Sequence, residues 1–144
     1  MSNFLTWEPN EGIGPIRFGG DINHYIELLK LVIDPDDAPD KTGWIQYQIP
    51  GKEVFIDAEA DKVESVLCYK EFFFKNQNLI GMKVIDLDIV LNCHADEIGD
   101  SILYDDGDLQ TPREYFSLGL QVWSSDNVVV SISCCTYADE CDLT

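Results

Sequence analysis

The chain has 144 residues, of which 27 are acidic and 9 are basic, so its formal net charge is −18. This length corresponds to a single domain spanning 1–144, and a hydrophobic content of 45% is sufficient to fill its core. The strong negative charge argues against nucleic acid and anionic membranes as partners, because proteins bind both through Lys and Arg.

The first third of the chain predicts one helix between two irregular segments. Residues 12–20, GIGPIRFGG, mix apolar residues with glycine and proline, which is typical of a short edge strand with tight bends. Asp21 is a good N-cap for a helix over 21–32, where apolar residues follow at helical spacing. Pro35 disfavours helical geometry in the residue before it, so the helix should end there. The acidic segment 34–43 predicts a loop.

The middle of the chain predicts a meander of strands and then a second helix. Apolar and β-branched residues indicate strands over 44–49, 54–56 and 63–69, the last continuing through 72–74, with turns at 50–51 and 58–61. Residues 83–92 predict a helix with Val84, Leu87 and Leu91 on one face.

The last third predicts strands over 101–104, 115–123 and 128–137. Asp106-Gly107 is a turn signal between the first two, and 125–127 between the last two. The sequence therefore predicts an α+β fold, in which antiparallel β-sheet is combined with two main helices.

The two halves of the sequence resemble each other. Phe18-Gly19, Ile22 and Leu29 match Ile80-Gly81, Val84 and Leu91 at an offset of 62, and Asp61, Val63 and Leu67 match Asp126, Val128 and Ile132 at an offset of 65. These matches predict a degenerate internal duplication with half-repeats over 12–75 and 76–137. Two sheets and two helices related by a pseudo-twofold axis would follow from it.

The cysteines predict a reduced protein. Their number is odd and their spacing matches no disulfide scaffold: Cys68, Cys93, Cys134, Cys135 and Cys141. The N-terminus also lacks the basic and apolar regions of a secretory signal. We therefore expect five free thiols and a cytoplasmic location.

No catalytic, metal-binding or cofactor-binding motif stands out. The glycines between 12 and 20 fit neither G-x-G-x-x-G nor the P-loop, and the acidic loops lack EF-hand spacing. The cysteines and histidines lack the paired spacing of a zinc site, and a cysteine–histidine dyad would need a tertiary coincidence. We expect a protein without catalytic residues, metal or cofactor.

The surface offers a better signal, because the charge is concentrated in the second half. Residues 84–144 carry 13 acidic groups and one basic group, Arg113, a net of −12. Aromatic residues adjoin the acidic loops, and this combination favours a basic partner, which carboxylates attract and aromatic rings anchor. The candidate binding residues are Tyr104, Asp105, Asp106 and Asp108 in one loop, and Asp36, Asp37, Asp40 and Trp44 in another.

The segments GIGPIRFGGDINHYIELLKLV (12–32) and EIGDSILYDDGDLQTPREYFSLGLQVW (97–123) carry a resemblance to a known family. The sequence resembles the immunity proteins of bacterial contact-dependent growth inhibition and related polymorphic toxin systems. The similar member is paired with a colicin-like toxin that cuts 16S ribosomal RNA, and its fold is Whirly-like. The resemblance covers most of the chain but rests on a pattern of glycines, helix and β-meander.

This resemblance implies a cytoplasmic protein that binds the C-terminal domain of its toxin, a basic ribonuclease, as a 1:1 heterodimer. The acidic surface would cover the active site or a neighbouring surface that the substrate needs. Two alternatives stay open: a small enzyme or ligand-binding domain with a pocket between the two halves, and an acidic DNA-mimic regulator.

Overall fold

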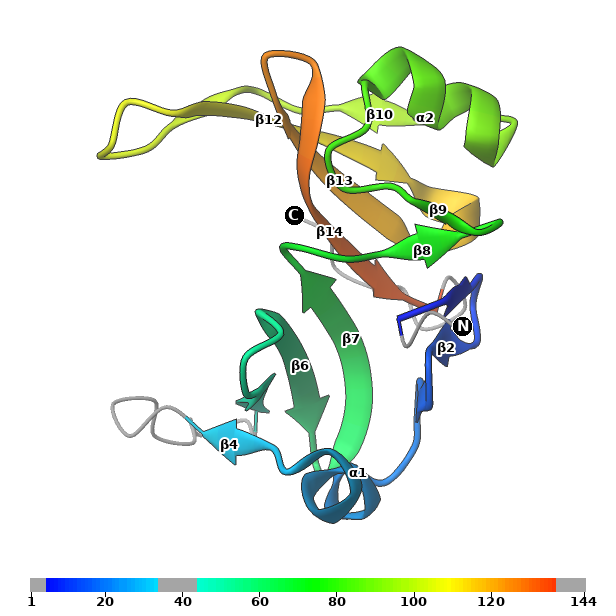
Figure 1. The fold of residues 1–144 in the computed structure, drawn as a ribbon, viewed down its shortest axis with the longest axis vertical. Helices are drawn as coiled ribbons and strands as arrows, with labels where there is room; N and C mark the ends of the chain where they lie inside the picture. Colours follow the sequence, from blue (N-terminus) through cyan, green and yellow to red (C-terminus); the bar gives the residue numbers. More distant parts are fainter. Residues whose placement is uncertain (1–4, 34–43, 137–144) are drawn as a thin grey trace.

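The computed structural model describes residues 5–33 and 44–136. Within them the chain forms a nine-stranded sheet, a three-stranded and a two-stranded sheet, and two α-helices (Figure 1). The strands of these sheets pair antiparallel, which confirms the α+β prediction. In chain order the elements are β1 (Trp7–Glu8), β2 (Gly12–Ile13), β3 (Ile16–Arg17), α1 (Ile22–Leu29), β4 (Val32–Ile33), β5 (Trp44–Ile49), β6 (Val54–Glu59), β7 (Lys62–Cys68), β8 (Phe73–Phe74), β9 (Gln77–Asn78), α2 (Val84–Leu91), β10 (Glu97–Ile98), β11 (Ile102–Leu103), β12 (Leu109–Tyr115), a 3-10 helix (Phe116–Leu118), β13 (Leu120–Ser125) and β14 (Val128–Cys135).

The large sheet joins the two halves at its centre. Its strand order is β10-β12-β13-β14-β7-β6-β5-β4, with β11 pairing beside β10 on β12. At the junction of the halves, β7 pairs with β14 so that Leu67 lies opposite Ser133. Alternate residues of these strands, such as Val66 and Ile132, are fully buried in one continuous core. One core therefore supports both halves.

The two halves share a set of backbone hydrogen bonds that dock each helix on its neighbouring hairpin. Each residue of α1 corresponds to the residue of α2 that lies 62 positions later. Each residue of the β6–β7 hairpin corresponds to the residue of the β13–β14 hairpin that lies 66 positions later. Val63 therefore corresponds to Val129, one residue beyond the Val128 that the sequence predicts. In the first half, the Gly19 N–H donates to the Val63 carbonyl at 2.7 Å and the Ile22 N–H donates to the Asp61 carbonyl at 2.8 Å. In the second half, the Gly81 N–H donates to the Val129 carbonyl at 2.8 Å and the Val84 N–H donates to the Asn127 carbonyl at 2.9 Å. The pairing of β7 with β14 has the same symmetry. A twofold axis through the Leu67–Ser133 pair exchanges Cys68 with Cys134, which are also 66 positions apart.

The first helix begins as predicted but ends earlier. The Asp21 carboxylate accepts the backbone N–H of Asn23 at 3.0 Å, which caps the helix. The helix ends at Leu29, not at residue 32, because Lys30 adopts a left-handed conformation with φ 54°. Val32–Ile33 can then pair with β5 as an edge strand. The second helix, Val84–Leu91, agrees with the prediction and buries the predicted face.

Two predicted strands are wrong in their extent. The strand predicted over 115–123 is interrupted by the 3-10 helix and by Gly119, whose φ of 62° is left-handed. This turn separates β12 from β13 and lets them pair as a hairpin. The strand predicted to continue through 72–74 ends at Cys68, and Phe73–Phe74 pair instead with β9.

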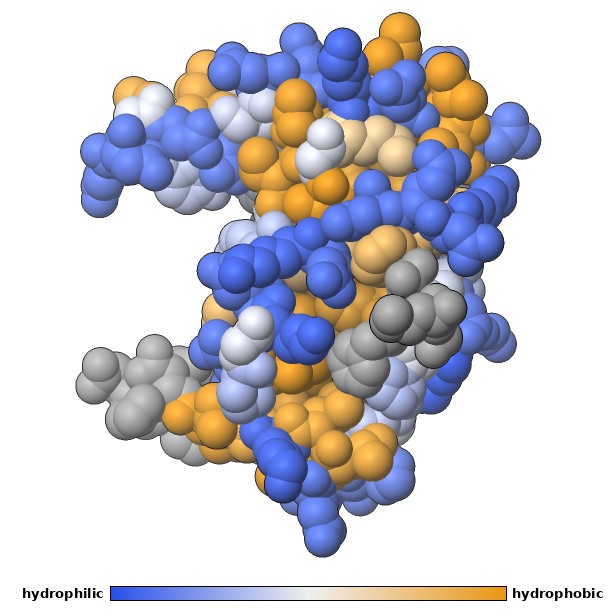
Figure 2. All heavy atoms as spheres, viewed as in Figure 1, coloured by the Kyte–Doolittle hydropathy of each residue, from blue (hydrophilic) through white to orange (hydrophobic). Residues whose placement is uncertain are grey.

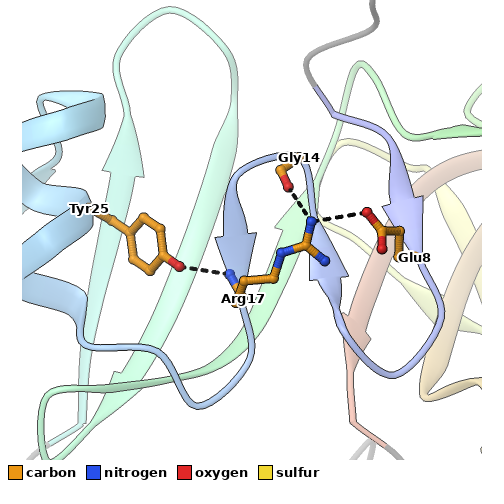
Figure 3. A network of polar contacts seen from close by, with 4 residues as sticks. All are labelled: Glu8, Gly14, Arg17 and Tyr25. Carbon is orange, nitrogen blue, oxygen red and sulfur yellow. Dashed lines mark hydrogen bonds and ion pairs between the residues drawn. The ribbon is translucent and has the colours of Figure 1, made fainter.

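A polar network ties the N-terminal sheet to α1 (Figure 3). The guanidinium of Arg17 donates to the Glu8 carboxylate at 3.0 Å and to the Gly14 carbonyl at 3.2 Å. The Arg17 backbone N–H donates to the Tyr25 hydroxyl oxygen at 3.0 Å. The ion pair lowers the pKa of Glu8, and the hydrogen bond from Arg17 contributes most. These contacts connect β1, β3 and α1.

The prediction of five free thiols is wrong. Cys68, Cys93 and Cys134 are free, whereas Cys135, at the end of β14, is disulfide-bonded. The prediction rested on spacing along the sequence, but a disulfide depends on which cysteines the fold brings together. Cys141, and the predicted strand beyond 136, lie outside the described residues.

Candidate functional site

The predicted acidic, aromatic loop forms the tip of a hairpin between β11 and β12, residues 102–109, which we call the acidic hairpin. It projects from the upper half of the molecule in Figure 1, and Figure 2 shows a hydrophilic tip beside hydrophobic side chains. Tyr104, Asp105 and Asp106 are exposed, and Asp108 is half-buried. The structure therefore brings the four residues of this predicted group together in one projection.

Backbone hydrogen bonds close the turn of the acidic hairpin. The Tyr104 N–H donates to the Asp108 carbonyl at 2.8 Å, and the Gly107 N–H donates to the Tyr104 carbonyl at 2.9 Å. Gly107 has a φ of 87°, which glycine adopts without steric cost. The Asp106 carboxylate accepts the Asp108 N–H at 2.9 Å, as expected for aspartate in a turn. The side chain of Asp105 has none of these structural roles.

Asp108 holds the acidic hairpin against the rest of the sheet. Its carboxylate accepts the Ser125 hydroxyl at 2.6 Å and the Gln110 side-chain amide at 2.8 Å. These hydrogen bonds, the one from Ser125 above all, lower the pKa of Asp108. Asp108 thus differs from its neighbours, because it shapes the hairpin.

Apolar side chains accompany the carboxylates. Leu103 is 69% exposed, Leu109 52% and Tyr104 43%. Tyr69, from the loop after β7, is also exposed and packs edge-to-face on Phe55, with ring centroids 5.7 Å apart. Burial raises the pKa of Tyr69, and the nearby Tyr104 phenol adds to the effect. An exposed apolar cluster of this kind is typical of an interaction surface.

The second predicted group is only partly visible. Trp44 begins β5, near the opposite end of the large sheet from the acidic hairpin, and is 38% exposed. Asp36, Asp37 and Asp40 lie outside the described residues. Trp44 and the acidic hairpin therefore belong to different halves of the fold.

A second polar cluster, which the sequence did not indicate, lies on α2. The Asp88 carboxylate accepts the Tyr115 hydroxyl at 2.7 Å, and its second oxygen lies 3.3 Å from Nδ1 of His94. Burial raises the pKa of Cys93 and the carboxylates of Asp88 and Asp96 raise it further, so its thiolate is disfavoured. A cavity of about 550 Å³ adjoins this cluster and is also lined by Arg113.

Among residues 5–33 and 44–136, no helix is long and apolar enough to cross a membrane. In the same residues, no three His, Cys, Asp or Glu side chains gather as metal ligands.

Comparison with known proteins establishes the fold alone. No family model matches the sequence, and neither does any curated protein. Among solved structures, the chain is similar to a cysteine-rich secretory protein from Staphylococcus aureus, with a TM-score of 0.54 and 18% sequence identity. The match covers 89% of this chain and 46% of that protein, so the chain spans about half the length of its structural neighbour.

Proposed function

We propose that this chain is an immunity protein of a bacterial contact-dependent growth inhibition system, which binds and neutralises the basic nuclease domain of its toxin. The acidic hairpin carries the proposal. It combines exposed carboxylates with exposed apolar side chains on a projecting element, Leu103 and Tyr104 beside Asp105 and Asp106. Such a combination supports recognition of a cationic protein surface.

The electrostatic part of the proposal follows from the charge distribution. A nuclease must present Lys and Arg to phosphate, so its substrate-binding surface attracts carboxylates. Residues 84–144 carry a net charge of −12. Within the part of the chain that the structure describes, neither Asp105 nor Asp106 belongs to an ion pair. The Asp105 carboxylate is available to a cationic partner, as is the oxygen of Asp106 that does not accept the Asp108 N–H.

Apolar contacts would supply most of the binding energy. Interface energy is concentrated in a few well-packed side chains, often aromatic, that are surrounded by polar groups. Tyr104 and Leu103 meet this description, because they are exposed in the free protein and bordered by carboxylates. The proposed complex is a 1:1 heterodimer in which the acidic hairpin covers the toxin's active site or the surface beside it.

The test is a protection assay with a matched binding measurement. The proposal predicts a neighbouring gene that encodes a basic C-terminal toxin domain. That domain is expressed in cells with or without this protein, and the purified pair is examined by calorimetry. Growth rescue together with 1:1 binding is the expected result. A protein that neither binds nor protects against that domain would refute the immunity function.

Cytoplasmic location is part of the same proposal, because a ribosome-cleaving toxin acts there. The disulfide at Cys135 counts against a reducing compartment. Fractionation of the producing cells tests the location, and thiol labelling of each fraction reports the redox state of Cys135. The protein is expected in the cytoplasmic fraction, and recovery only outside the cytoplasm would overturn the assigned location.

A ligand-binding domain is the second candidate, favoured by the 550 Å³ cavity beside α2. Lys83, Asp88, Arg113 and Asp126 line it, so it offers charges of both signs to a small polar molecule. A thermal-shift screen against polar metabolites tests this function. A ligand-induced rise in Tm that survives Asp105→Lys would support it over the first.

A further inference from the structure

Helix α2 is apolar on both faces, although one face is open to solvent. Val84, Leu87 and Leu91 are buried. On the opposite face Ile85 and Ile89, one turn apart, are 71% and 72% exposed, the highest values among the large exposed hydrophobic residues of the described chain. Two neighbouring large apolar side chains that are this exposed favour an interaction surface, and the outer face of α2 lacks a cover in the free protein.

The other half of the fold provides an internal comparison. α1 and α2 occupy equivalent positions, as their shared hydrogen bonds to the β6–β7 and β13–β14 hairpins show. At the offset of 62, the residues of α1 that correspond to Ile85 and Ile89 are Asn23 and Glu27, both exposed. Polar residues are therefore fully compatible with this position in the fold. The apolar pair on α2 is not required for folding.

Hollows on both sides of these isoleucines make the surface suitable for side-chain insertion. One is the cavity of about 550 Å³, and the other has a volume of about 420 Å³ and is lined in part by Ile89 and His94. Both hollows are lined by Ile85 and Asp88, which lie between them. Partner side chains entering both hollows would bury the exposed isoleucines.

The charges around α2 decide which partner fits. α2 contains Asp86 and Asp88 and no basic residue. Lys83 and Arg113 line the hollow near the N-terminal end of α2. After the C-terminal end of α2, the chain carries three carboxylates before it reaches the acidic hairpin: Asp96, Glu97 and Asp100. A second copy of this chain would add another −18, so self-association is electrostatically disfavoured.

We propose that the outer face of α2 is a docking surface for a basic, amphipathic protein segment. Its apolar side chains cover Ile85 and Ile89 and enter the two hollows, and its cations lie toward Asp88 and residues 96–100. α2, β10 and the acidic hairpin occupy the same end of the molecule (Figure 1), so one basic partner can contact both surfaces. The inference goes beyond the proposed function, because it depends on no particular toxin.

The test uses a synthetic helical peptide of about 18 residues, with leucines along one face and lysines along the other. Its Kd is measured by fluorescence anisotropy at physiological salt for the parent and for the double variant Ile85→Asn/Ile89→Glu, which introduces the residues of α1. We expect the double variant to bind about tenfold more weakly. Because Ile89→Glu adds a negative charge, this loss reports the apolar contact.

Three controls accompany the measurement. Leu28→Asn removes an exposed leucine from α1 and should leave the Kd unchanged. A peptide with glutamate in place of every lysine should not bind. Amide shifts on peptide addition should concentrate on 84–94, and circular dichroism should show that the double variant is folded, because both altered side chains are exposed.

Several results would overturn the inference. They are failure of the lysine peptide to bind the parent, equal affinity for the double variant, amide shifts that map away from α2, and a parent dimer that the double variant abolishes. The last would identify a second copy as the occupant. Failure to protect cells against the toxin would refute the immunity function and leave the peptide result intact.

Discussion

Charge reversal at the tip of the acidic hairpin separates the carboxylate that we propose to contact a partner, Asp105, from the one that shapes the hairpin, Asp108. Asp105 is exposed and its side chain takes no part in the hydrogen bonds that close the turn. Asp105→Lys should therefore leave folding intact, as most exposed substitutions do. Asp108→Lys should lower Tm, because it removes the acceptor for Ser125 and Gln110.

The expected loss of binding follows from the energy of an interfacial charge pair. A close interfacial charge pair can be worth about 1.5 kcal/mol or more, and replacing its attraction with repulsion loses that amount. Since about 1.4 kcal/mol corresponds to a factor of ten in Kd, Asp105→Lys should weaken the toxin complex at least about tenfold. Cells with this variant should lose protection while accumulating folded protein.

The matched control is Glu27→Lys, which makes the same charge change on the exposed face of α1. Calorimetry and thermal melting of both variants give Kd and Tm from the same preparations. Glu27→Lys should reproduce the parent in both. If Asp105→Lys binds and protects as well as the parent, or if both reversals weaken binding equally, the acidic hairpin is not the contact surface.

Three further results are expected. Association with the toxin should slow as salt rises from about 50 to 500 mM while dissociation changes less, and stopped-flow rates that ignore salt would refute electrostatic steering. Leu87→Ala, in the core, should cost about 2–5 kcal/mol in chemical denaturation, whereas Ile89→Ala should change stability by no more than about 0.5 kcal/mol. Burial and the bond to Asp88 raise the pKa of Tyr115, so its contribution to stability is present below pH about 10 and is lost as pH rises further. Tyr115→Phe should therefore show a smaller alkaline loss of stability, and an unchanged loss would contradict this reason.

Comparison of sequence and structure shows which features are local. Both helices follow from apolar spacing, and the start of α1 follows from the cap at Asp21. The hairpin turn at Asp126 and Asn127 follows from turn chemistry, because both residues adopt positive φ. Each of these signals lies within a few residues of the structure it specifies.

The features that escaped prediction depend on residues far apart in the chain. The edge strand at Val32–Ile33 is one such case, because it exists only through its pairing with β5. In the sequence, Asp108 is indistinguishable from the other carboxylates of its loop. Its structural role depends on Ser125, which the fold brings within hydrogen-bond distance. The disulfide at Cys135 escaped prediction for a different reason, because the spacing of the cysteines matches no disulfide scaffold.

The acidic hairpin and α2 also differ in how far the sequence indicates them. The sequence alone indicated the hairpin as a candidate binding loop, since carboxylates and a tyrosine are adjacent from Tyr104 to Asp108. The spacing of apolar residues in α2 correctly indicated the face of Leu87 as the buried one, but it does not reveal whether the opposite apolar face is also covered. Only the tertiary structure shows that Ile89 stays exposed, because burial depends on packing between distant elements.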